Sequence, residues 1–144
     1  MRRALEIARD TARQGDVPVG ALLVDGEGSI LAEAGNGTVR LSDPTAHAEI
    51  LVLREAGRCL GAPRLPDTTL YVTLEPCLMC LGAMVQARIS RLVFAAEDPK
   101  VGATKLLARI PVTFRGLNHH FDVTGGVLED QATALLKTFF RGRR

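Results

Sequence analysis

The sequence has few cysteines, no long apolar run and little net charge. Its 144 residues include three cysteines, an odd number without the paired spacings of a disulfide framework, so we expect a reduced, cytoplasmic protein. No apolar run approaches the roughly 18 residues of a membrane span, and we expect no membrane partner. A formal charge of +2 excludes a basic field over the whole protein, so any nucleic-acid contact needs a local patch.

Two short segments contain residue types that bind metal ions. Cys77 and Cys80 are three positions apart and follow Pro76, a residue that can open a helix. The first turn of a helix has unpaired N–H groups, which favour thiolates over thiols on one shared face. His47 adds a nitrogen ligand of a type that zinc accepts, and three protein ligands leave a tetrahedral ion one open position, as in catalytic sites. Glu49 is then the expected base.

The spacing of His47 and Glu49 restricts where this ion can lie. Residues two apart on a helix project about 200° from each other, so both cannot face one side of it. We therefore expect the metal beyond the beginning of a helix. Asp43 and Pro44 fit an N-cap and a first helical position, which predicts a helix over residues 44–55 that stops at Gly57.

Alternating helical and strand patterns predict an α/β fold. Helical spacing covers residues 1–14, and a further helix is expected to run from the cysteines to Ala87. Apolar runs predict a hairpin over residues 17–34 and buried strands over residues 69–74 and 91–96. A last helix with a broad apolar face is expected from residue 127 onwards. This order is that of a three-layer α/β/α sandwich with a mixed sheet.

The remaining sulfur and imidazole side chains have simpler interpretations. Cys59 is predicted to be a small buried hydrophobic residue. Met79 and Met84 are expected to fill the core, because a thioether is a poor match for zinc beside thiolates. His119 and His120 invite a metal role, which we reject because the set of three zinc ligands is already complete.

The metal-binding residues also carry a resemblance. His47-Ala48-Glu49 together with Pro76-Cys77-Leu78-Met79-Cys80 resembles the zinc-dependent cytidine and deoxycytidylate deaminase superfamily. Within it, the segments 43–50 and 70–77 are most similar to the bacterial tRNA-specific adenosine deaminases, and the likeness extends from Val17 to Arg141. The resemblance implies that residues 1–144 form one deaminase domain with a five-stranded mixed sheet of the cytidine deaminase type.

The resemblance implies a reaction as well as a fold. It implies one zinc ion per subunit, no organic cofactor, and hydrolytic conversion of adenosine to inosine at the wobble position of a tRNA anticodon. It further implies that the substrate is an arginine tRNA and that the protein is a homodimer whose subunit contact helps to form the site. Neither of these last two properties follows from spacing or composition.

Substrate contacts are implied at several further positions. Asn36 lies between two glycines, a setting typical of a turn residue, but the resemblance implies that its amide binds the target nucleoside. The charges in the loop 97–103 could simply be solvated. The tail, residues 139–144, could also be solvated, but its aromatic pair beside arginines is suited to stacking on RNA bases. The residues for which the resemblance implies RNA contact are Asp98, Lys100, Asn118, Phe140 and Arg143.

Three other functions fit parts of the pattern. A deaminase of a free base or nucleoside, such as guanine or cytosine, would share the zinc motif. A non-catalytic, zinc-stabilised RNA-binding subunit is a second alternative, although a structural site needs no carboxylate such as Glu49 and usually recruits a fourth protein ligand. A redox pair would require a disulfide between Cys77 and Cys80 and no role for His47.

Overall fold

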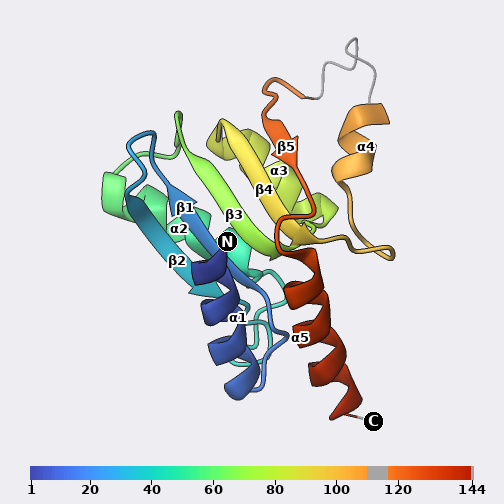
Figure 1. Cartoon of the computed structure of the whole chain (residues 1–144). Helices are drawn as coiled ribbons and strands as arrows, with labels where there is room; N and C mark the ends of the chain where they lie inside the picture. Colours follow the sequence, from blue (N-terminus) through green and yellow to red (C-terminus); the bar gives the residue numbers. More distant parts are fainter. Residues whose placement is uncertain (110–116, 144) are drawn as a thin grey trace.

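The computed structural model describes residues 1–109 and 117–143 and contains a five-stranded mixed sheet (Figure 1). The strand β1 (Gly20–Val24) lies between β2 (Ile30–Gly35) and β3 (Thr69–Leu74) and is antiparallel to both. The strands β4 (Arg91–Ala96) and β5 (Asp122–Thr124) continue the sheet parallel to β3, in the order β2-β1-β3-β4-β5. The predicted α/β fold with a mixed sheet is confirmed.

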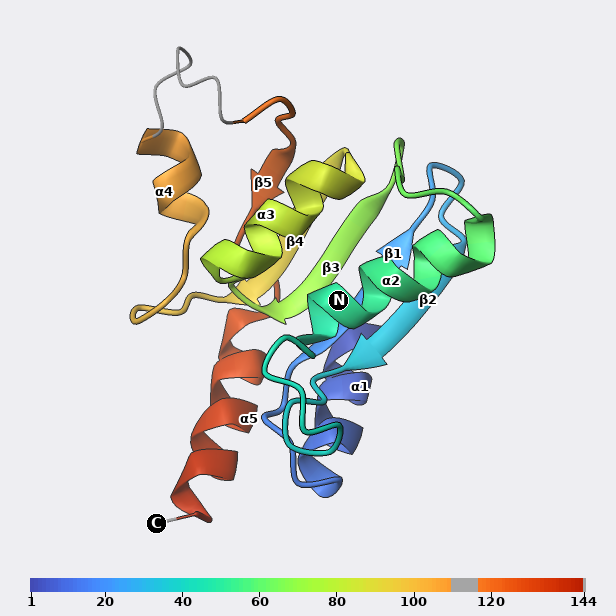
Figure 2. The same cartoon turned by 180° about the vertical axis from the view of Figure 1, so that it is seen from behind.

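Helices cover both faces of this sheet. α1 (Arg2–Arg13) and α5 (Glu129–Arg141) lie on one face, and α2 (Ala48–Leu60) and α3 (Leu78–Ala87) lie on the other (Figures 1 and 2). A short helix that the sequence analysis did not foresee, α4 (Thr104–Arg109), follows β4. The larger core cluster lies between the sheet and the pair α2 and α3, and a smaller one lies under α1 and α5. No helix in the described part of the chain is long and apolar enough to cross a membrane.

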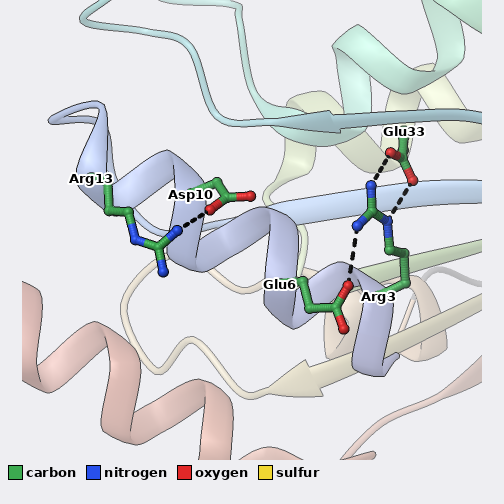
Figure 3. A network of polar contacts seen from close by, with 5 residues as sticks. All are labelled: Arg3, Glu6, Asp10, Arg13 and Glu33. Atoms are coloured by element: carbon green, nitrogen blue, oxygen red, sulfur yellow. Dashed lines mark hydrogen bonds and ion pairs between the residues drawn. The ribbon is translucent and has the colours of Figure 1, made fainter.

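The helix α1 lies unusually close to the sheet at Gly20. A Cβ atom at this position would be 2.2 Å from the carbonyl oxygen of Ala4 and 2.7 Å from the backbone nitrogen of Ala8. Small residues on both elements therefore let the helix backbone touch β1. Arg3 connects the same helix to Glu33 of β2, and Nη1 of Arg3 also lies 3.1 Å from Glu6 Oε2 (Figure 3). These exposed ion pairs contribute at most about 1 kcal/mol each, so the close packing at Gly20 matters more for the position of α1.

The beginning and end of α2 differ from the prediction. The expected N-cap, Asp43, instead accepts hydrogen bonds from the backbone nitrogen and the hydroxyl of Thr45 at 2.8 and 2.7 Å. These bonds form a turn of the kind that aspartate favours, and this turn delays the helix until its N-cap at His47. At the other end, Gly57 lies inside the helix, which continues to a left-handed cap at Gly61 with a φ of 62°.

Two of the sulfur predictions are wrong. Cys59 is exposed in the last turn of α2, where its thiol donates to Glu55 Oε1 at 3.3 Å. Met79 is 38% exposed, whereas Met84 is fully buried as predicted. The two methionines differ because positions five apart on a helix project about 140° from each other, so only one of them faces the core.

Candidate active site

The beginnings of α2 and α3 bring the predicted metal ligands together. His47 is the N-cap of α2, Cys77 is the N-cap of α3, and Cys80 lies in the first turn of α3. The Nδ1 atom of His47 is 3.7 Å from Cys77 Sγ and 3.5 Å from Cys80 Sγ, and the two sulfurs are 3.7 Å apart. Among the described residues, these three form the group whose ligand atoms lie within 4.8 Å of one another and could hold a metal ion.

The three distances fit a tetrahedral zinc ion. Bonds of about 2.3 Å to sulfur and about 2.0 to 2.1 Å to nitrogen place the ligand atoms about 3.5 to 3.8 Å apart. A disulfide would instead require the two sulfurs to be about 2.0 Å apart. Both cysteines are free thiols, so the arrangement fits a metal site better than a redox pair.

Burial changes the protonation of this group. It lowers the pKa of His47, which favours the neutral imidazole that binds metals. Burial also raises the pKa of the Cys80 thiol, with smaller contributions in the same direction from Glu49 and Cys77. This direction is opposite to the one that the helix N-terminus was expected to impose, so a stable thiolate at Cys80 requires a neighbouring cation.

Glu49 lies beside the metal-binding group, two residues after His47 in the first turn of α2. Its side chain is only 4% exposed. Burial raises the pKa of Glu49 to about 7, against the opposing effect of hydrogen bonds from its own backbone and from Cys80. A carboxyl group with a pKa near neutrality is suited to accept a proton and to return it.

A cavity of about 190 Å³ opens over these side chains. His47, Glu49 and Cys77 line it, together with residues of the segments that precede β1 and that follow β2, β3 and β4. The segment after β2 contributes Asn36, and the loop after β4 contributes Asp98. The structure therefore brings two of the predicted substrate-binding residues to the same cavity as the metal-binding group.

Two buried carboxylates were missed by the sequence analysis, Glu75 in the lining of this cavity and Asp16 behind its wall. Asp16 is 1% exposed and accepts a hydrogen bond from Asn36 Nδ2 at 3.1 Å. Glu75 is 5% exposed and accepts from the backbone nitrogens of Asp98 at 3.0 Å and Thr104 at 3.1 Å, and also from the hydroxyl of Thr104. Each carboxylate thus holds one of the loops that form the cavity wall. In the sequence, each of these carboxylates is marked only as an acidic residue beside an apolar run.

The other predicted RNA contacts lie outside this cavity. Lys100 and Phe140 line a second cavity of about 450 Å³ between the loop after β4 and α5. The guanidinium of Arg143 lies 4.3 Å from the centre of the Phe139 ring and donates a hydrogen bond to the carbonyl of Gly15. Asn118 is exposed, and its backbone carbonyl accepts a hydrogen bond from Arg88 Nη1 at 3.0 Å.

Sequence comparison agrees with this geometry. The profile of the MafB19-like deaminase family matches residues 1–144. The chain belongs to this deaminase family. The deaminase is 46% identical to the tRNA-specific adenosine deaminase of Haemophilus influenzae over all of its own length and 83% of that protein. It is 44% identical to the tRNA-specific adenosine deaminase of Bacillus subtilis, over its full length and 88% of the relative.

Solved structures resemble the deaminase as well. One comes from a study of A-to-I editing by tRNA:A34 deaminases at the wobble position of transfer RNA. It has a TM-score of 0.87 and 44% identity, with coverage of 94% of this chain and 97% of that chain. A guanine deaminase from Nitrosomonas europaea gives a TM-score of 0.78 at 28% identity, with coverage of 96% and 81%. Deaminases of the same fold therefore include enzymes named for different substrates.

Proposed function

We propose that this deaminase hydrolyses adenosine to inosine at the wobble position of a tRNA anticodon and that zinc is its metal. The observation that carries the proposal is the convergence of His47, Cys77 and Cys80 beside the buried carboxyl of Glu49. Full-length similarity to tRNA-specific adenosine deaminases supports tRNA as the substrate. The proposed species is an arginine tRNA, as the family resemblance implies.

The proposed zinc site uses one imidazole nitrogen and two sulfurs. Nδ1 of His47 and Sγ of Cys77 and Cys80 would hold the ion, because their mutual distances match those of a tetrahedral site. When bound, zinc would supply the Lewis acidity that lowers the pKa of water from 15.7 toward about 7.

Glu49 is the proposed general acid and base. Its carboxylate takes a proton from the attacking water and gives it to the ring nitrogen of adenine as C6 is attacked. The proton of the hydroxyl group now on C6 then passes through the same carboxyl group to the amino group. The C6–N bond breaks, ammonia leaves, and the oxygen stays on C6 as the carbonyl of inosine. Burial raises the pKa of Glu49, which favours its acceptance of a proton, and a bound zinc ion would act on the pKa in the opposite direction.

An anticodon loop is a physically suitable substrate. Its bases can leave the stack at lower cost than bases of a duplex, and an unstacked base can enter a small cavity. Asn36 and Asp98 are the proposed contacts inside the cavity. Lys100 and Phe140, which share the second cavity with Lys137 and Arg141, would contact the flanking RNA, and Asn118 and Arg143 are proposed as further contacts by similarity.

A direct competition between substrates tests the proposal. Zinc-loaded protein is incubated with an anticodon stem-loop that carries adenosine at the wobble position, and separately with guanine, cytosine, cytidine and adenosine. Mass spectrometry should detect the gain of about one dalton that accompanies conversion of adenosine to inosine only in the stem-loop. A matched stem-loop with guanosine at that position is the control. Turnover of guanine with no turnover of the stem-loop would assign the protein to the other substrate class.

We further propose that the protein is a cytoplasmic homodimer. The homodimer is what the family resemblance implies, and the cytoplasm is what the unpaired cysteine count of the sequence suggests. Light scattering should give twice the chain mass of 15.5 kDa, and a mass equal to that of one chain would contradict the dimer.

A further inference from the structure

Asp16 is a buried carboxylate without a part in the proposed proton transfers. It lies between α1 and β1 and is 1% exposed. Its Oδ1 atom accepts hydrogen bonds from Asn36 Nδ2 at 3.1 Å, Thr38 Oγ1 at 3.2 Å and the backbone nitrogen of Val39 at 3.1 Å. Its Oδ2 atom accepts from the backbone nitrogen of Arg40 at 2.9 Å. One side chain thus holds the whole segment that follows β2.

These bonds determine the orientation of the Asn36 amide. A carboxylate only accepts hydrogen bonds, so the group of Asn36 that faces Asp16 must be the NH₂ group. The second hydrogen of that group is used by the Thr38 hydroxyl, which accepts from Nδ2 at 3.0 Å and donates its own hydrogen to Asp16. In the described part of the chain, Oδ1 of Asn36 has no hydrogen-bond partner, and it is therefore the atom of this amide that remains available to a ligand.

We propose that Asp16 is a positioning residue that fixes Asn36 at the cavity wall, so that the Asn36 carbonyl oxygen accepts a hydrogen bond from an N–H or hydroxyl group of the target nucleoside. The proposal deepens the proposed function and rests on it, because it concerns substrate recognition in the same site. Asp16 acts through Asn36 and Thr38, which line the cavity, whereas Asp16 itself is not among the lining residues.

An amide could not replace this carboxylate. Asparagine at position 16 would offer one oxygen and one NH₂ group to four donors. Its NH₂ group would then face either the backbone N–H of Arg40 or the NH₂ group of Asn36, and two donors that face each other repel. The variant Asp16→Asn keeps the size of the side chain, so it tests the charge and the acceptors without leaving a hole.

A double-mutant cycle distinguishes positioning from general stabilisation. For the anticodon stem-loop, kcat/KM should fall by about 10-fold to 100-fold in Asp16→Asn, the scale expected when a binding group is misplaced. Asn36→Ala should cost at least as much, and the double variant should be no worse than Asn36→Ala. Asp10→Asn, an exposed position on α1 that pairs with Arg13, is the control and should retain wild-type kcat/KM. Multiplication of the two single effects, or wild-type kcat/KM in Asp16→Asn, would overturn the proposal.

A readout without turnover separates this proposal from the proposed function. The side-chain amide signals of Asn36 in ¹⁵N-resolved NMR spectra of the zinc-loaded protein should shift in Asp16→Asn and in Thr38→Val, but not in Asp10→Asn. If Asp16→Asn does not fold, Thr38→Val removes one connection and should lower kcat/KM only where Asn36 is present. Unshifted Asn36 signals would contradict the positioning role, whereas shifted signals in a protein inactive on the stem-loop would contradict only the assigned substrate.

Discussion

At the scale of single residues, Glu49 and Glu55 show how burial changes the pKa of a glutamate. Both lie on α2. Glu49 is 4% exposed beside the metal-binding group, and burial raises its pKa to about 7. The side chain of Glu55 is 45% exposed and pairs with Arg58 at 2.6 Å, and the hydrogen bond from Arg58 lowers the pKa of Glu55. The same residue type on one helix therefore differs in proton affinity because its surroundings differ.

Replacement of Glu49 by glutamine should remove turnover and leave the metal in place. Glutamine fills the same volume but transfers no proton, and proton transfer by a positioned group contributes about 10²-fold to 10⁴-fold to a rate. We expect kcat on the stem-loop to fall by about 10³-fold in Glu49→Gln, with the zinc content per chain unchanged in mass spectrometry of the native protein. Glu55→Gln should behave like the wild type. A Glu49→Gln variant within tenfold of wild-type kcat would remove Glu49 from the mechanism.

The metal-binding residues could be predicted from the sequence because local spacing encodes them. Cys77 and Cys80 share the beginning of one helix, and His47 and Glu49 share the beginning of another. Asp16 and Glu75 could not be predicted in this way. Their partners include backbone N–H groups of distant loops, and backbone groups are the same at every non-proline position and leave no pattern in the sequence.

At the scale of elements, the contact between α1 and β1 sets the position of the connection between them, which contains Asp16. Gly20→Ala would place a Cβ atom 2.2 Å from the carbonyl oxygen of Ala4, so α1 would have to move. Overpacking of this kind costs about 1 to 3 kcal/mol, and we expect a loss near the upper end in the free energy of unfolding measured with urea.

A glycine on the surface of another helix is the matched control for that substitution. Gly82 in α3 has no atom within 4 Å of an added Cβ, so Gly82→Ala should raise the free energy of unfolding by about 0.5 to 1 kcal/mol. Equal effects of the two substitutions would contradict the close contact at Gly20.

The loop after β4 gives a second prediction at this scale. A Cβ atom at Gly102 would lie 2.2 Å from Glu75 Oε2 and 2.5 Å from the backbone carbonyl of Asp98, so Gly102→Ala should displace the loop from Glu75. We expect kcat/KM on the stem-loop to fall by about 10-fold to 100-fold, because Asp98 lines the cavity. Gly26→Ala, where the nearest atom is 3.5 Å away, should keep wild-type kcat/KM. If Gly102→Ala also kept it, this loop would not form part of the site.

Strands were easier to predict than helix ends. The predicted ranges 69–74 and 91–96 match β3 and β4, because helices cover both faces of the sheet there and most side chains in these runs are apolar. The beginning of α2 was predicted incorrectly because Asp43 can cap a helix or close a turn with its own neighbours, and local sequence does not decide between them. The short α4 carried no periodic signal.

At the scale of the whole molecule, the order of elements was predictable and the distribution of charge was not. The net charge of +2 shows no basic excess, yet Lys100, Lys137 and Arg141 line one cavity together with the exposed ring of Phe140. These residues come from the loop after β4 and from α5, which the sheet brings side by side (Figure 1).

The salt dependence of RNA binding should report this cationic surface. Each phosphate contact with a single strand contributes about 0.7 to the slope of log K against log salt concentration. Lys100→Ala should weaken stem-loop binding and reduce the steepness of this slope by about that amount. Arg64→Ala, an exposed position in the segment between α2 and β3, should leave affinity and slope unchanged. Equal losses in both variants would indicate that the RNA is attracted by overall charge alone.

X-ray absorption spectroscopy at the zinc edge would show whether His47, Cys77 and Cys80 hold one catalytic zinc ion with a position left for water. The spectrum of zinc-loaded protein should fit two sulfurs at about 2.3 Å and two nitrogen or oxygen atoms at about 2.0 to 2.1 Å, and the Cys59→Ser variant should give the same result. A shell with three or four sulfurs, or one without sulfur, would contradict this set of ligands.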